Sequence, residues 1–135
     1  MDNENRIPVA LAKCAEYDTS IMPETVGRLL DTIACRPGRG TKVLVKPNLL
    51  APTPPDYLPC THPLVVRSVC RYLLDLGAKV RVGDSPTFGN AIEIGRKIGL
   101  TDALADLSVQ MVNLSRPKLV RLASGRRVPI SQVAL

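Results

Sequence analysis

The chain has 135 residues, 45% of them hydrophobic, with one Phe, three Tyr, no Trp and a formal net charge of +6. This length suits a single domain over residues 1–135 with a real core, and the scarcity of aromatic rings argues against a nucleic-acid surface, which stacks bases on such rings. No apolar run approaches the roughly 18 residues that cross a bilayer, so we expect no membrane segment.

The cysteines indicate neither a disulfide framework nor a zinc knuckle, because they form no CxxC pair and the chain has a single His. The N-terminus is acidic where a targeting peptide would be basic, so we expect a cytoplasmic protein with reduced thiols. Cys14 and Cys60 are weak candidates for metal ligands, since two thiols fall short of the three or four ligands that such sites need. Cys70 is expected in the core.

The first part of the chain predicts a strand, a helix and a second strand. Residues 7–13 alternate toward apolar side chains and predict the first strand. Apolar residues at helical spacing predict a helix from about Met22 to about Cys35. Residues 42–46 contain an unbroken apolar run, the pattern of a central strand whose two faces are both covered by helices.

A proline-rich loop and a second helix come next. The loop of residues 50–59 carries four prolines, which stiffen it and suit a lid. Thr61 is a good N-cap for a helix that runs to about Leu76 and stops at Gly77. On the outer face of this helix, Arg71 and Asp75 have the spacing of an ion pair.

The remaining elements complete an α/β pattern. Val80 and Val82 predict a strand, a third helix stops at Gly99, and residues 109–114 predict a fourth strand. Residues 118–135 predict a β-hairpin. The fold class is therefore α/β, with three layers, a mostly parallel sheet, helices on both faces and a C-terminal hairpin. The apolar ending predicts either a truncated larger domain or a tail that docks on the sheet.

Polar residues follow two strands that we expect to be neighbours. Lys46 and Asn48 follow the first of these strands, and Asp84 and Ser85 end the second. Parallel strands end at a common sheet edge, where open α/β sheets bind ligands. We therefore expect a pocket for an anionic small molecule at this edge, with Lys46 near the free N-terminus of the helix that follows.

Two further residues join this candidate site. Thr61 and His62 start the second helix, and His62 is the single imidazole, able to act as acid, base or ligand near neutral pH. Structural alternatives remain open: Lys46 and Asp84 could form only a structural ion pair, and His62 could be only a first-turn residue. The glycines form neither a GxGxxG nor a GxxxxGK[ST] motif, which disfavours classical dinucleotide or Walker-type binding.

With these residues assembled, the chain resembles the N-terminal part of the uncharacterised DUF362 family. The resemblance implies a link to iron–sulfur chemistry, because family members are often joined to ferredoxin-like four-iron, four-sulfur modules, but it implies no particular reaction. A later family segment with a Lys-x-His pattern is absent, which implies a truncated domain. The matching segments are Cys14 with Tyr17, residues 43–50 (VLVKPNLL), 61–67 (THPLVVR) and 80–86 (VRVGDSP).

Two functions remain open at this point. The chain is expected to bind an anionic small molecule and to work with a 4Fe-4S module in the full-length protein, with no cofactor in this segment. Alternatively, it is a non-catalytic scaffold that docks an electron-transfer partner, such as an iron–sulfur protein, through a basic C-terminal segment. From residue 107 onward that segment has no acidic residue, and its basic residues are Arg116, Lys118, Arg121, Arg126 and Arg127.

Overall fold

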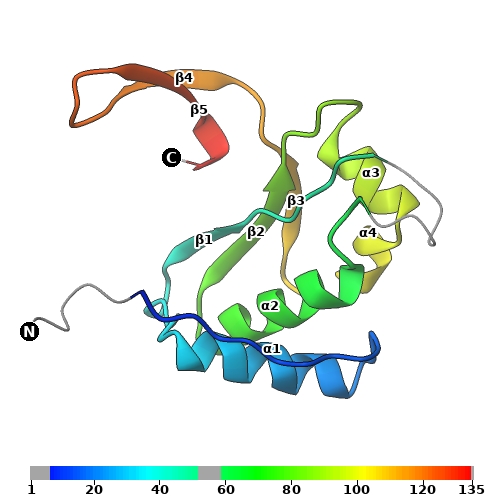
Figure 1. Cartoon of the computed structure of the whole chain (residues 1–135). Helices are drawn as coiled ribbons and strands as arrows, with labels where there is room; N and C mark the ends of the chain where they lie inside the picture. The colour runs from blue at the N-terminus through cyan, green and yellow to red at the C-terminus, as the bar shows by residue number, and fades with distance from the viewer. Residues whose placement is uncertain (1–6, 52–58, 135) are drawn as a thin grey trace, which may run out of the picture.

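A computed structural model describes residues 7–51 and 59–134, and its centre is a three-stranded parallel sheet with the order β1-β2-β3 (Figure 1). An antiparallel hairpin of two strands follows at the C-terminal end. The predicted α/β class, parallel sheet and hairpin are confirmed. The strands are β1 (Lys42–Val45), β2 (Lys79–Asp84), β3 (Gln110–Asn113), β4 (Pro117–Arg121) and β5 (Arg127–Ser131).

The four helices form where apolar residues recur at helical spacing. In the second helix, Val66, Cys70 and Leu73 are all buried, and Cys70 is a core residue as predicted. The first helix packs against the second, and Tyr72 Oη donates a hydrogen bond of 2.7 Å to Asp31 Oδ1 between them. The helices are α1 (Ile21–Thr32), α2 (Pro63–Asp75), α3 (Ala91–Lys97) and α4 (Leu100–Ala103).

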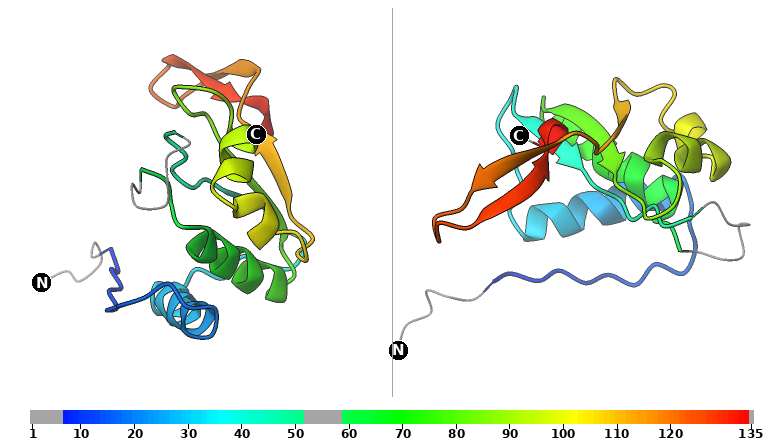
Figure 2. Two further views of the ribbon diagram at one scale, coloured as in Figure 1. Left: turned by 90° about the vertical axis from the view of Figure 1, so that its right-hand side faces the viewer. Right: turned by 90° about the horizontal axis from the view of Figure 1, so that it is seen from above.

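The helices cover one face of the sheet, which differs from the predicted cover on both faces. Val80 and Val82 of β2 are buried in one cluster with α2 and α3, and Figure 2 shows the helices on the same side of the sheet. Lys79 and Arg81 alternate with them and are exposed. Because side chains alternate across a strand, Lys79 and Arg81 lie on the second face of the sheet, where none of the helices α1 to α4 packs.

The first strand of the sheet lies at an edge, so its prediction as a central strand was wrong. β2 is central: Val43 and Val45 of β1 pair in register with Val80 and Val82, and β3 lies on the other side of β2. Gly83 permits the close approach of β3, because a Cβ atom there would lie 2.8 Å from the carbonyl oxygen of Val112.

The predicted strand at residues 7–13 does not form. This stretch has no regular secondary structure and runs alongside α1, apart from the sheet (Figure 2). Its apolar side chains Ile7, Val9 and Leu11 are 85%, 78% and 93% exposed. A strand needs a neighbouring strand to bind its backbone N–H and C=O groups. Residues 7–13 pair with neither edge strand of the sheet.

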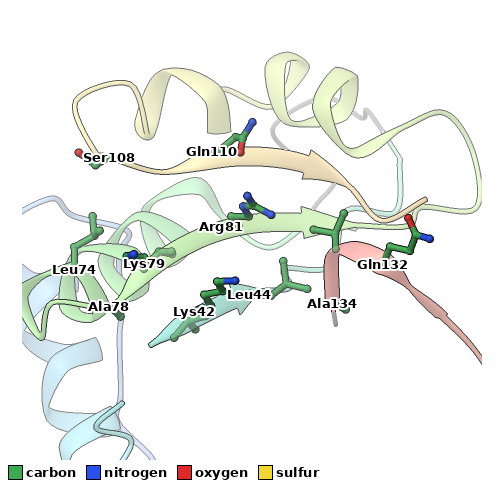
Figure 3. A pocket seen from close by; sticks show the side chains of 13 residues that line it. Lys42, Leu44, Leu74, Ala78, Lys79, Arg81, Ser108, Gln110, Gln132 and Ala134 are labelled. Carbon is green, nitrogen blue, oxygen red and sulfur yellow. The ribbon is translucent and has the colours of Figure 1, made fainter. Parts of the chain in front are cut away.

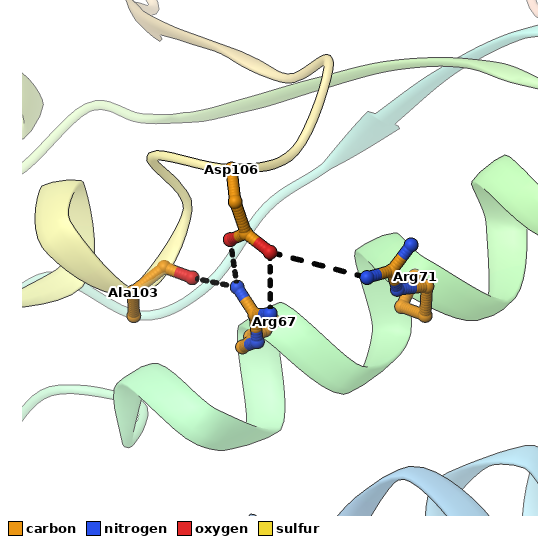
Figure 4. Close-up of polar contacts among 4 residues, drawn as sticks. All are labelled: Arg67, Arg71, Ala103 and Asp106. Carbon is orange, nitrogen blue, oxygen red and sulfur yellow. Dashed lines mark hydrogen bonds and ion pairs between the residues drawn. The ribbon is translucent and has the colours of Figure 1, made fainter.

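The predicted ion pair between Arg71 and Asp75 is replaced by contacts with Asp106. Both guanidinium nitrogens of Arg67 bind the Asp106 carboxylate, and Arg71 Nη2 lies 3.9 Å from its Oδ2 (Figure 4). Arg67 also donates to the carbonyl oxygen of Ala103 at 2.5 Å. These contacts join α2 to the chain after α4, and the hydrogen bonds from Arg67 lower the pKa of Asp106 to about 2.

Two further sequence predictions concern the loop and the membrane. The predicted lid at residues 50–59 falls largely on residues 52–58, which lie outside the described residues. Over the described parts of the chain, no helix has the length and apolar character needed to cross a bilayer.

Candidate functional site

The carboxyl ends of β1 and β2 bring Lys46 and Asp84 together, as the sequence predicted. Val45, the last residue of β1, pairs in register with Val82, so both strands end at the same edge. Lys46 Nζ lies 2.5 Å from Asp84 Oδ1. The ion pair therefore forms exactly where the parallel arrangement requires it, and its role in binding a ligand stays a prediction.

The Asp84 carboxylate is buried, with 5% of its side chain exposed. Oδ2 accepts a hydrogen bond of 2.8 Å from the backbone N–H of Leu49. Oδ1 accepts no hydrogen bond of regular geometry within the described residues, and its close partner is Lys46 Nζ. Burial raises the pKa of Asp84, but the ammonium group of Lys46 and the backbone N–H groups of Leu49 and Ser85 outweigh it and hold this pKa below its ordinary value.

The Lys46 side chain remains 58% exposed while it contacts Asp84. An ammonium group has three N–H donors, and the contact with Asp84 needs only one of them. Within the described residues the other donors have no partner, so they can bind a ligand that arrives from solvent. Asp84 thus holds Lys46 in position at the edge while the lysine side chain stays accessible to solvent.

Asn48 and Thr61 close the base of the loop that follows β1. The backbone N–H of Asn48 donates to Thr61 Oγ1 at 2.9 Å, and the N–H of Thr61 donates to the Asn48 carbonyl oxygen at 2.8 Å. Asn48 Nδ2 donates to the carbonyl oxygen of Pro59 at 2.7 Å. The side-chain amide of Asn48 is therefore engaged in the loop, whereas the Thr61 hydroxyl still has its proton to donate.

His62, and not Thr61, is the N-cap of α2, so that part of the prediction was wrong. His62 Nδ1 accepts a hydrogen bond of 3.2 Å from the backbone N–H of Leu64, and its carbonyl oxygen accepts from Val65 and Val66. The first N–H groups of α2 are therefore satisfied by the protein itself. The free N–H groups expected at the start of α2 are therefore occupied, and the ligand pocket at this edge stays a prediction.

The imidazole of His62 stacks on Tyr17, a contact that sequence reasoning missed. The two ring centroids lie 3.8 Å apart and the rings are inclined by 6°. Burial lowers the pKa of His62, which favours the neutral ring at neutral pH. Because Nδ1 accepts from Leu64, the neutral ring holds its proton on Nε2 and can donate it to a ligand.

The third strand contributes Asn113 to the same edge, and sequence reasoning missed this residue too. Asn113 pairs in register with Asp84, and its Oδ1 accepts from the backbone N–H of Ile92 at 3.2 Å. A polar residue at the end of a predicted parallel strand was the signal that could have revealed it. Ser85 follows Asp84 and is exposed, so its hydroxyl is accessible from solvent.

Comparison with known proteins identifies the family. The model for the domain of unknown function DUF362 matches residues 43–135, which include β1, the edge and the hairpin. The chain belongs to the DUF362 family. Lys46, Asn48, Thr61, His62, Asp84 and Ser85 all lie within the matched residues, whereas Cys14 and Tyr17 precede them.

A curated protein is similar to this DUF362 chain. The thylakoid-associated protein sll1697 of Synechocystis is 30% identical over 109 residues, which cover 77% of this chain and 33% of the relative. The chain thus spans about one third of the length of the relative that it matches. No solved structure matches it.

The surroundings of three cysteines of this DUF362 chain bear on whether they could hold a metal. Cys14 Sγ contacts Met22 Sδ at 3.4 Å, and Cys60 Sγ contacts the Ala51 carbonyl oxygen at 3.2 Å. Burial raises the pKa of Cys70 to about 12, which disfavours the thiolate that a metal requires. Over residues 7–51 and 59–134, no three potential ligands come together as a metal site.

Proposed function

We propose that the carboxyl edge of the DUF362 sheet binds an anionic small molecule, with the ammonium group of Lys46 as its anchor. The observation that carries the proposal is the geometry of Lys46, which lies 2.5 Å from Asp84 Oδ1 while more than half of its side chain faces solvent. Asp84 stays ionised at neutral pH because its pKa is held low, so its carboxylate keeps the ammonium group of Lys46 at this edge.

The neighbouring polar groups are hydrogen-bond donors, which an anion needs. The hydroxyl of Thr61 and the Nε2–H of His62 are donors left over after their contacts within the protein. The hydroxyl of Ser85 adds a donor on the exposed side of Asp84. Hydrogen bonds from such donors to an anionic oxygen are charge-assisted and stronger than neutral ones.

A titration with two simple anions tests this proposal. Inorganic phosphate and acetate are added to the chain, and the backbone amide signals of Asn48, Leu49 and Ser85 are followed by NMR. We expect Lys46→Ala to weaken binding by about tenfold, or about 1.4 kcal/mol. Lys97→Ala removes an exposed cation on α3 and serves as the matched control. Equal affinity of Lys46→Ala and the wild type would count against the site.

We also propose that this edge works with a 4Fe-4S module elsewhere in the full-length protein. The support is the resemblance of the sequence together with the length of the relative, of which this chain spans 33%. Because the cysteines described above do not form a cluster site, the module would supply its own ligands. Iron and sulfide assays on the full-length protein and on the 135-residue chain test this, with cluster expected in the former alone.

The second candidate function is a non-catalytic scaffold that docks an iron–sulfur protein through the hairpin. It is favoured by the exposed side chains of Arg126 and Arg127 at the hairpin turn. An acidic ferredoxin is the probe, and its binding should weaken as ionic strength rises. Neutralising both arginines should abolish this binding, and salt-independent binding would argue against the scaffold. A cytoplasmic location remains part of both proposals, and the thylakoid association of the relative makes it worth measuring by fractionation.

A further inference from the structure

The face of the sheet opposite the helices is lined by side chains that point out of the sheet in register. Leu44 of β1, Arg81 of β2 and Gln110 of β3 are paired neighbours across the three strands, and Lys42 pairs with Lys79 at their start (Figure 3). We call these five residues the open face. It lies on the flat of the sheet, whereas Lys46 and Asp84 lie at its carboxyl edge.

A groove of about 620 Å³ runs over the open face. The turn formed by Gln132–Ala134 after β5 closes it on one side, and Figure 3 shows Ala134 beside Leu44. Leu44 provides an apolar floor that is half-buried, while Arg81 and Gln110 stand exposed around it. The groove therefore combines an apolar centre with a polar margin.

The charge of the open face is entirely positive. Lys42, Lys79 and Arg81 are exposed, and none of them forms an ion pair with an acid of the described residues. The groove has no acidic residue among those that line it. A partner that covers this face must bring carboxylates, because three cations that lose water without a counter-charge would oppose docking.

The parallel arrangement of the strands indicates what kind of element fits there. Parallel sheets are normally covered on both faces, and the covering elements are helices that lay an apolar stripe on the sheet. Here α2 and α3 supply that cover on the Val80 and Val82 face. We propose that an acidic amphipathic helix of a partner polypeptide docks on the open face, with its apolar stripe on Leu44 and its carboxylates on Lys42, Lys79 and Arg81.

Two synthetic helical peptides test this docking. They share one stripe of Leu residues and differ in the polar face, which carries Glu in one and Lys in the other. Each is labelled with a fluorophore and titrated with the chain, and binding is followed by fluorescence anisotropy. We expect the Glu peptide to bind about tenfold more tightly than the Lys peptide, with a difference that shrinks as ionic strength rises. Equal binding of both peptides would overturn the proposal.

Charge reversal locates the binding. Arg81→Glu should weaken binding of the Glu peptide by about tenfold and strengthen binding of the Lys peptide. If Arg81→Glu fails to fold, Lys79→Glu should change both affinities in the same direction. Arg127→Glu reverses an exposed cation on the hairpin and is the matched control. If only Arg127→Glu weakens binding, the hairpin is the docking surface and the proposal is wrong. A dimer that Arg81→Glu dissociates in analytical ultracentrifugation would assign the face to a second copy and would also overturn it.

Discussion

Asp84 Oδ2 accepts the backbone N–H of Leu49 at 2.8 Å and thereby ties the turn after β1 to the end of β2. Leu49 is completely buried, so no water replaces this bond if the carboxylate is lost. The same carboxylate holds Lys46 through its other oxygen. One side chain thus fixes both the backbone and the cation of the candidate site.

Removal of the Asp84 carboxylate should therefore destabilise the fold. We expect Asp84→Ala to lower the free energy of unfolding by about 2 kcal/mol, because Leu49 N–H is left buried without an acceptor. Urea denaturation measures this change. Glu24→Ala is the control, since the Glu24–Arg28 pair is exposed with a separation of 3.9 Å and should change the free energy by about 0.5 kcal/mol or less. A loss no larger than that of the control would contradict the role of Asp84.

The contribution of Asp84 should depend on pH in a defined direction. Its pKa is lower in the folded chain than the ordinary value of 3.8, so folding favours the ionised form. The stabilisation is fully present above the ordinary pKa and is lost as the pH falls through the lower pKa of the folded state. The free energies of unfolding of the wild type and of Asp84→Ala, measured with urea, should therefore differ most above the ordinary pKa of 3.8 and converge as the pH falls below it. A gap that widens in acid would refute this sign.

Gly83 should not tolerate a side chain. In Gly83→Ala the new Cβ would lie 2.8 Å from the carbonyl oxygen of Val112, so β2 and β3 would have to separate. We expect a loss of about 1–3 kcal/mol in the free energy of unfolding, as for other overpacked sites. Gly38→Ala is the matched control, because its Cβ would have Thr41 Oγ1 at 3.7 Å as its nearest neighbour. Thermal unfolding of both variants checks the difference, and similar midpoints would show that the strands can adjust.

His62 should stabilise α2 only while its ring is neutral. His62→Ala removes the acceptor for Leu64 N–H and should cost about 1 kcal/mol, whereas His62→Asn should restore most of it, because Asn is a good N-cap. Tyr17→Ala separates the effect of the ring stack from that of the cap. Urea denaturation of the three variants measures these differences.

The pH dependence of this cap has its own sign. Burial lowers the pKa of His62, so its stabilisation is present above the ordinary pKa of 6.5 and is lost as the pH falls through the lower pKa of the folded state. A protonated ring has two N–H groups and cannot accept from Leu64. The wild type should lose stability between about pH 7 and about pH 5, and His62→Asn should not. The same loss in both proteins would exclude this cap as its cause.

Sequence patterns predicted that Lys46 and Asp84 meet, because this depends only on strand direction. Lys46 and Asp84 follow apolar strands, and parallel pairing alone brings them to one edge. It was harder to predict which of two adjacent polar residues caps α2. Thr61 and His62 are both plausible caps, and the choice depends on Asn48, whose backbone N–H binds the hydroxyl of Thr61.

Patterns also could not say which faces and edges find a partner. The apolar run of β1 suggested cover on both sides, yet Leu44 lies on the open face, where its neighbours are Arg81 and the C-terminal turn. The alternation in residues 7–13 shows that this stretch could form a strand. It does not show that a free sheet edge lies beside the stretch. The pairing of Arg71 with Asp106 likewise joins residues whose separation in sequence no helical spacing reveals.

The stack of Tyr17 on His62 gives the chain a built-in optical reporter. The protein has three tyrosines and no tryptophan, so the ring of Tyr17 is one of only three phenols that absorb in the near ultraviolet without interference from indole. Protonation of the imidazole beneath that ring, or a molecule that displaces it, changes the surroundings of the phenol directly. Events at the start of α2 can thus be followed without any label.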